Sequence, residues 1–157
     1  MTTRTRPTFR PLIVVVAVVA IVLVGFVIWR GNQSVAEQDR GKAAATARCI
    51  AALRDDMRTT FETKGGNSVA DSEKLAEAAQ FTEVKVKSAE LTDEQRQMVQ
   101  NQGNSVDSID RAWRISGALV IPGFARSGAT YGPNNTFACR TVVFKDGSAT
   151  VIQRQIN

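Results

Sequence analysis

The sequence contains no histidine among its 157 residues. This absence excludes general acid–base catalysis by imidazole, Ser-His-Asp and Cys-His nucleophiles, and haem or zinc sites with imidazole ligands. The adjacent carboxylates Asp55-Asp56 and Asp93-Glu94 do not replace it, because neighbouring residues on a helix point about 100° apart. We interpret both pairs as solvated helix surface. No motif indicates a substrate, so we predict a non-enzymatic protein without a cofactor and without a metal site.

A concentrated excess of positive charge is also lacking, although the pI is about 9.7. The chain has 20 Lys and Arg against 15 Asp and Glu. Four of the basic residues are Arg4, Arg6, Arg10 and Arg30, which leaves 16 against all 15 acidic residues in the remainder, a net charge of +1. A surface that binds DNA or RNA needs clustered positive charge. We therefore predict no nucleic-acid partner.

One long apolar run, Leu12–Trp29, carries no charged or strongly polar side chain. A helix rises about 1.5 Å per residue, so a run of this length can cross a hydrocarbon core of about 30 Å. Three arginines precede the run, and only Arg30 follows it before the first acidic residue. The positive-inside rule then places the N-terminus in the cytoplasm. We predict a single-pass protein of the inner cell membrane, with Arg10, Trp29 and Arg30 as anchors at the interfaces of the lipid bilayer.

A cleaved signal peptide is the alternative, because Ser34-Val35-Ala36 resembles a small-x-small cleavage site. The retained anchor is favoured for two reasons. The apolar run is longer than the apolar region of a signal peptide, which usually has about 7–15 residues, and Arg30 lies between the run and the cleavage site. The small residues of the run do not stand at small-xxx-small spacing, so self-association is not indicated.

These features divide the chain into four predicted segments. They are a cytoplasmic stub at 1–10, a transmembrane helix at 11–30, a helical stalk at 31–48 and an extracytoplasmic domain at 49–157. The 127 residues that follow Arg30 are enough for one ordinary domain and too few for two.

The two cysteines, Cys49 and Cys139, lie far outside the C-x-x-C spacing of a redox motif. On the outer side of a membrane they meet an oxidising compartment, where a structural disulfide is the default. We predict that they are bonded to each other. Two free thiols, or a pair that exchanges with a partner, are the alternatives.

Helical periodicity is clearest from Asn32 to about Thr63, which we predict to be one long helix. Its apolar stripe is expected to consist of Ile50, Leu53, Met57 and Phe61, with Cys49 beside it. Further helices are expected to begin at Ser68 and at the capping box Thr92–Gln95, the latter anchored by Met98 and Val99. A short strand, Glu83–Lys87, is expected to place Val84 and Val86 on one apolar face.

From Asp110 onward the apolar period changes to two, which predicts three strands. One face of the first strand is expected to carry Trp113, Ile115, Gly117, Leu119 and Ile121. The second strand is Thr136–Phe144 and the third is Ala149–Ile156. Alternate positions of the third are Thr150, Ile152, Arg154 and Ile156. Lys145–Ser148 is a hairpin signal between the last two. We predict an α+β fold: a single N-terminal transmembrane helix, then a small outer domain of helices packed on an antiparallel sheet of three or four strands.

The loop Pro122–Asn135 is the candidate binding loop, with Phe124, Arg126, Tyr131 and Asn134 as its binding residues. It exceeds the usual hairpin length, and exposed Tyr and Arg among small residues are typical of binding surfaces. The alternative is that Phe124 and Tyr131 fold back and close the edge of the sheet.

In layout, the chain resembles small bacterial envelope proteins whose outer domains have the nuclear-transport-factor-2-like fold. The likeness carries no diagnostic motif, and we assign no family from it. We expect a membrane-anchored accessory or scaffold protein whose outer domain binds a membrane-protein complex, such as a secretion or respiratory assembly. The alternative is a small-ligand-binding or envelope-sensing domain with a cavity between helix and sheet.

The first prediction concerns the N-terminus of the mature protein. We expect residues 1–30 to be retained, because the apolar run is long enough to remain in the membrane. Mass spectrometry of the N-terminal peptide from native membranes measures this directly. A mature N-terminus at Glu37 would instead show cleavage after Ala36.

Overall fold

The computed structural model describes residues 39–122, 131–132 and 134–157. The predicted membrane anchor, its interface residues Arg10, Trp29 and Arg30, and the possible cleavage site at 34–36 lie outside the described residues. No helix in the described part is long and apolar enough to cross a membrane. Residues 40–157 form one compact unit.

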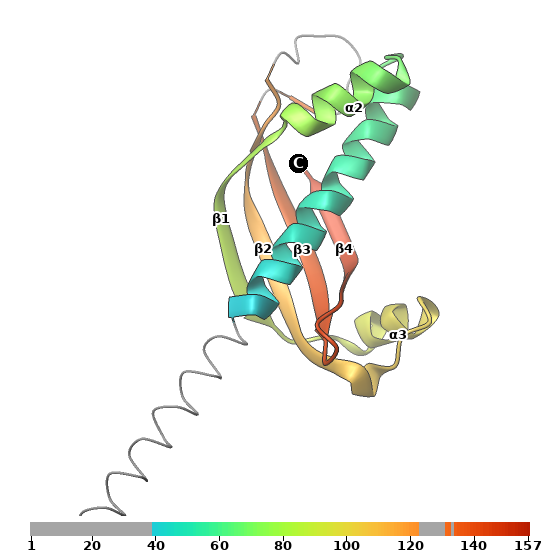
Figure 1. The fold of residues 1–157 in the computed structure, drawn as a ribbon, viewed down its shortest axis with the longest axis vertical. Coiled ribbons are helices and arrows are strands. Elements are labelled where there is room, and N and C mark those ends of the chain that lie inside the picture. The colour runs from blue at the N-terminus through green and yellow to red at the C-terminus, as the bar shows by residue number, and fades with distance from the viewer. Residues whose placement is uncertain (1–38, 123–130, 133) are drawn as a thin grey trace, which may run out of the picture. The chain divides into compact units, whose positions relative to one another are not determined.

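A helix over residues 39–63 crosses one face of a four-stranded antiparallel sheet (Figure 1). Each strand pairs with the next in chain order: β1 (Gln80–Ala89), β2 (Ile109–Val120), β3 (Asn134–Phe144) and β4 (Ala149–Ile156). The shorter elements are α2 (Val69–Ala78), α3 (Asp93–Asn101) and the 3-10 turn η1 (Val106–Ser108). The prediction of an α+β domain with an antiparallel sheet is confirmed, with the larger of the two expected strand numbers.

The buried stripe of helix 39–63 differs from the predicted one. Five residues at a spacing of four are 0–1% exposed, namely Ala45, Cys49, Leu53, Met57 and Phe61. Ile50, predicted to belong to the stripe, is half-buried at its side. Each step of four residues turns the helix about 40° past a full turn, so the buried face winds around the helix as it crosses the sheet. Cys49 therefore lies within the stripe rather than beside it.

Contact with the sheet begins earlier than the boundary predicted at residue 49. Ala45 is fully buried in the main core, and a Cβ on Gly41 would lie 3.7 Å from Nε1 of Trp113. The Lys42 amine and the Arg111 guanidinium lie 5.9 and 5.6 Å from the centroid of the same indole, a cation–π distance. Because the residues of this part of the helix are small, the helix comes close to the sheet, and the large Trp113 side chain occupies the space between them.

β1 is longer than the predicted strand and contains a bulge between Thr82 and Lys85. Within the bulge, Glu83 has a φ of 52°, in the left-handed region that favours glycine. The predicted apolar face of Val84 and Val86 is confirmed only for Val86, because Val84 lies inside the bulge. Val86 packs against the main core, whereas Val84 is 38% exposed.

Gly117 on β2 lies opposite this bulge and leaves no room for a side chain. A Cβ there would lie 2.6 Å from the carbonyl oxygen of Thr82 and 2.8 Å from Cε1 of Phe137. The close approach of β1 to the core at this point therefore depends on glycine.

The starts of both short helices are confirmed. The Ser68 side chain caps α2, and Thr92 and Gln95 form a complete capping box at α3. Val99 of α3 is fully buried, but Met98 is 45% exposed, so its predicted anchoring role is wrong. Adjacent residues on a helix diverge by about 100°, and only one of the two can face the sheet.

β2, the 145–148 turn and β4 also form where the sequence predicts them. In the turn, the Ser148 backbone N–H and hydroxyl donate to Oδ1 of Asp146 at 2.9 and 2.7 Å, and these bonds lower the pKa of that carboxyl. The predicted alternation along β4 fails, because the register shifts between Arg140 and Thr141 of β3. The shift places Ile152 in a second core cluster, on the face away from helix 39–63.

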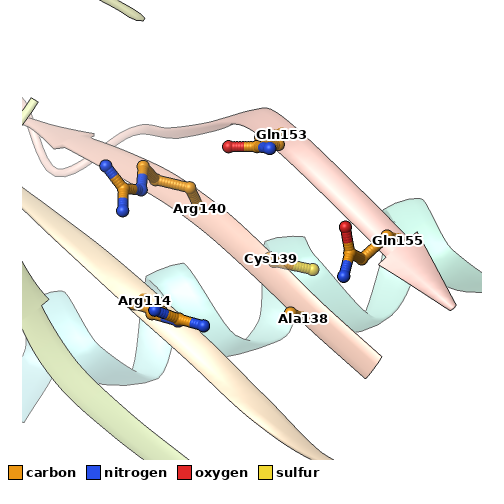
Figure 2. Close-up of a pocket in the computed structure, with 6 residues that line it drawn as sticks. All are labelled: Arg114, Ala138, Cys139, Arg140, Gln153 and Gln155. Carbon is orange, nitrogen blue, oxygen red and sulfur yellow. The ribbon is translucent and has the colours of Figure 1, made fainter. Parts of the chain in front are cut away.

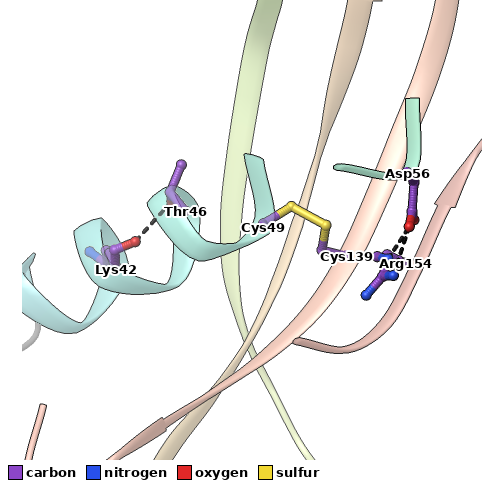
Figure 3. The surroundings of a disulfide bond; sticks show 6 residues. All are labelled: Lys42, Thr46, Cys49, Asp56, Cys139 and Arg154. Atoms are coloured by element: carbon purple, nitrogen blue, oxygen red, sulfur yellow. Dashed lines mark hydrogen bonds and ion pairs between the residues drawn. A yellow bond between two sulfur atoms is a disulfide. The ribbon is translucent and has the colours of Figure 1, made fainter. Parts of the chain in front are cut away.

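Cys49 and Cys139 form the predicted disulfide, with their Cα atoms 5.9 Å apart, and it joins helix 39–63 to β3 (Figure 3). In the β3–β4 register, Arg154 lies opposite Cys139. Its Nη2 donates to Oδ1 of Asp56 on the helix at 2.7 Å, and this partner raises the pKa of the guanidinium. An exposed ion pair of this kind contributes at most about 1 kcal/mol, whereas closing a loop this long contributes about 4 kcal/mol. The disulfide therefore contributes more to the stability of the domain than the ion pair does.

We expect replacement of both cysteines, Cys49→Ala with Cys139→Ala, to lower the free energy of unfolding by about 2–5 kcal/mol, because the unfolded chain loses its cross-link. Urea unfolding followed by circular dichroism measures the change. Asp56→Asn is the control that removes only the ion pair, and its expected loss is about 1 kcal/mol or less. Equal stabilities of the double variant and the wild type would contradict the role assigned to the disulfide.

Candidate functional site

The face of the sheet away from helix 39–63 is only partly covered. At one end α3 packs on it, where the second core cluster consists of Val99, Ala112, Val142, Phe144 and Ile152. Beyond that cluster, the side chains of Arg114 on β2 and of Gln153 and Gln155 on β4 are exposed, and helix 39–63 lies behind the sheet in Figure 2. We call this region the open face; no element within the described residues packs over it.

Three basic side chains stand in register across the open face. Lys87 of β1 is opposite Arg114 of β2, and Arg114 is opposite Arg140 of β3. The line continues to Gln153 of β4. We call Lys87, Arg114 and Arg140 the cationic row. Directly opposite side chains in an antiparallel sheet have Cβ atoms about 4.5–5.5 Å apart, so this arrangement of like charges is destabilising.

Within the described ranges, no acidic side chain forms an ion pair with the cationic row. The ion pairs described between residues of the domain are Arg58 with Asp55 and Arg154 with Asp56. Arg140 instead donates from Nη1 to Oε1 of Gln95 at 2.6 Å and to the carbonyl oxygen of Glu90 at 3.0 Å. These bonds hold its guanidinium toward α3, while Lys87 and Arg114 are exposed.

A hollow of about 200 Å³ lies over β3 between the row and the end of β4. Its lining includes Arg114, Arg140, Gln153 and Gln155, with the small Ala138 between them (Figure 2). Guanidinium groups only donate hydrogen bonds, whereas glutamine amides donate and accept. Neither group exchanges protons near neutral pH, so the arrangement is suited to binding anionic and amide groups rather than to acid–base catalysis.

The predicted binding loop is described only in part. Phe124 and Arg126 lie outside the described residues, and Asn134 is exposed at the start of β3. Tyr131 packs edge-on against Phe61 of helix 39–63, with ring centroids 6.2 Å apart. Its hydroxyl lies 3.3 Å from Oγ1 of Thr60. Tyr131 thus packs on helix 39–63, and the binding role of the loop stays a prediction.

Side chains of the main core are buried between helix 39–63 and the sheet. The largest side chains buried there are Trp113, Phe61, Phe137, Leu53 and Met57. A second hollow, of about 300 Å³, lies at the surface between this helix and α2 and has basic and acidic residues in its lining, among them Arg54, Asp55 and Glu73. Its charges compensate one another, unlike those of the open face.

Repulsion within the cationic row gives a testable effect on stability. We expect Arg114→Gln to raise the free energy of unfolding by about 0.5–1 kcal/mol at low ionic strength, because it removes the central charge of the row. The gain should shrink at about 1 M salt, where the screening length falls to about 3 Å. Thermal unfolding at both salt concentrations measures it, with Arg48→Gln on the exposed side of helix 39–63 as the charge-matched control. A loss of stability at both concentrations would contradict the repulsion.

Comparisons of the chain with family models, with curated proteins and with solved structures found no significant match. A functional conclusion therefore depends on the residues and geometry described above.

Proposed function

We propose that the chain is a non-enzymatic accessory or scaffold protein, held in the cell membrane by Leu12–Trp29, whose extracytoplasmic domain binds a membrane-protein complex through the open face. A secretion or respiratory assembly is the kind of complex expected. The observation that carries this proposal is the cationic row, which places three like charges in register on an uncovered surface. Natural proteins keep such locally unfavourable arrangements mainly at functional sites.

The disulfide supports the location outside the cytoplasm. Structural disulfides persist in oxidising compartments and are rare in the cytosol. Cys49 and Cys139 are 0% and 3% exposed, so their bond is part of the core rather than an accessible thiol pair. This favours a structural bond over exchange with a partner.

The side chains of the open face support binding rather than catalysis. The hollow combines guanidinium and amide groups, and the whole sequence contains no histidine that could serve as a base beside them. A rigid sheet with charges fixed by register suits recognition of a partner surface, because binding then orders few additional groups.

A small-ligand-binding or envelope-sensing domain is the second proposal that the sequence suggested. That function requires a cavity between helix and sheet, and Trp113, Phe61 and Phe137 occupy the described part of this space. The geometry therefore favours the accessory function.

Site-specific crosslinking of the full chain in its native membrane tests the accessory function. A photoreactive residue at Thr136, which is exposed on the open face, should crosslink one membrane protein in stoichiometric yield. The same residue at Ala47, exposed on helix 39–63, is the matched control and should crosslink it weakly. Extraction in mild detergent should then recover the same protein without crosslinking.

A lone monomer that retains a small molecule and crosslinks from neither position would contradict the accessory function. That result would favour the ligand-binding alternative.

A further inference from the structure

The geometry of the cationic row indicates the chemistry of what it binds. Lys87, Arg114 and Arg140 occupy directly paired positions on three adjacent strands, so the row runs straight across the sheet. In Figure 2 the guanidinium groups of Arg114 and Arg140 point away from each other rather than toward one point. A single small anion would be held by converging groups, whereas separated charges in a line fit several anionic groups carried on one extended molecule.

The surroundings of the row fit a polypeptide. Gln153 and Gln155 line the hollow beside Arg114 and Arg140, and their amides can donate to carbonyl oxygens and accept from N–H groups of a peptide. Ser116 and Ala138 lie opposite each other in the next row of the sheet. Their small side chains leave room for another backbone to approach.

Two other polyanions fit less well. Stable contact with an anionic lipid surface requires apolar groups that insert, and the large hydrophobic residues exposed in the described part, Val69, Val84 and Met98, lie on three different elements. Single-stranded nucleic acid is normally held by aromatic side chains on which bases stack. The residues that line the hollow include no aromatic side chain.

We propose that the cationic row, with Gln153 and Gln155, binds an extended acidic segment of the partner protein, an inference that rests on the proposed accessory function. Carboxylates of the segment pair with Lys87 and Arg114, which have no ion-pair partner among the described residues. The segment thereby removes the repulsion within the row. Binding should accordingly weaken as salt is added.

The test uses the full chain in nanodiscs of phosphatidylcholine and a short fluorescent peptide that alternates glutamate with serine. Fluorescence anisotropy should show binding of this peptide and none of the same peptide with glutamine in place of glutamate. Lys87→Gln with Arg114→Gln should weaken binding by about tenfold or more, and its midpoint of thermal unfolding should not fall below that of the wild type. Arg140 is left unchanged because its bonds to Gln95 and Glu90 are structural.

The matched control is Arg48→Gln with Lys74→Gln, which removes the same charge from exposed positions outside the open face and should leave the affinity unchanged. Equal weakening by both double variants would overturn the proposal, because attraction would then be non-specific. Stronger competition by oligothymidylate or by phosphatidylglycerol vesicles, dependent on Lys87 and Arg114, would also overturn it in favour of that ligand.

Crosslinking and peptide binding separate the two proposals. A partner crosslinked from Thr136 together with no binding of the glutamate peptide would overturn the acidic segment and leave the accessory function standing. Specific peptide binding with no crosslinked partner would support the acidic ligand and contradict the membrane-protein partner.

Discussion

The packing of helix 39–63 across the sheet determines which face of the domain is core and which is open. Ala45 and Cys49 bring the helix close to the sheet, and the disulfide to Cys139 fixes it over β3. Because the bond joins residues 90 apart in the sequence, it ties the first helix of the domain to the C-terminal hairpin. Among the described residues, the other face is covered where α3 packs, and most of its remaining polar side chains are exposed.

Local signals in the sequence predicted most of the elements. Capping residues identified the starts of α2 and α3, and alternation with turn residues identified β2 and the β3–β4 hairpin. The errors arose where an extra residue interrupts a strand. The bulge at Thr82–Lys85 contains Val84, which is exposed, whereas Val86 packs on the main core. The register shift at Arg140–Thr141 moves Ile152 to the second core cluster. Such shifts depend on pairing with a neighbouring strand, which one sequence does not reveal.

The candidate site could not be predicted for the same reason. The part of the chain after Arg30 has a net charge of +1, so composition gives no sign of a basic surface. Lys87, Arg114 and Arg140 come from three separate strands, and only the register places them side by side. Reasoning from residue types instead selected the 122–135 loop, of which the structure describes only part, including the contacts of Tyr131 with Phe61 and Thr60. The grouping of these basic side chains on one face therefore arises from strand pairing and cannot be read from composition.

The proposed function requires that a partner covers the open face in the membrane and that this face is accessible in the isolated protein. Modification of arginine by phenylglyoxal, followed residue by residue with mass spectrometry, tests it most directly. We expect Arg114 to react rapidly in the purified full chain and slowly in native membranes, while Arg48, exposed on helix 39–63, reacts equally fast in both. Equal rates for Arg114 in the two preparations would show that no partner covers the open face in the membrane.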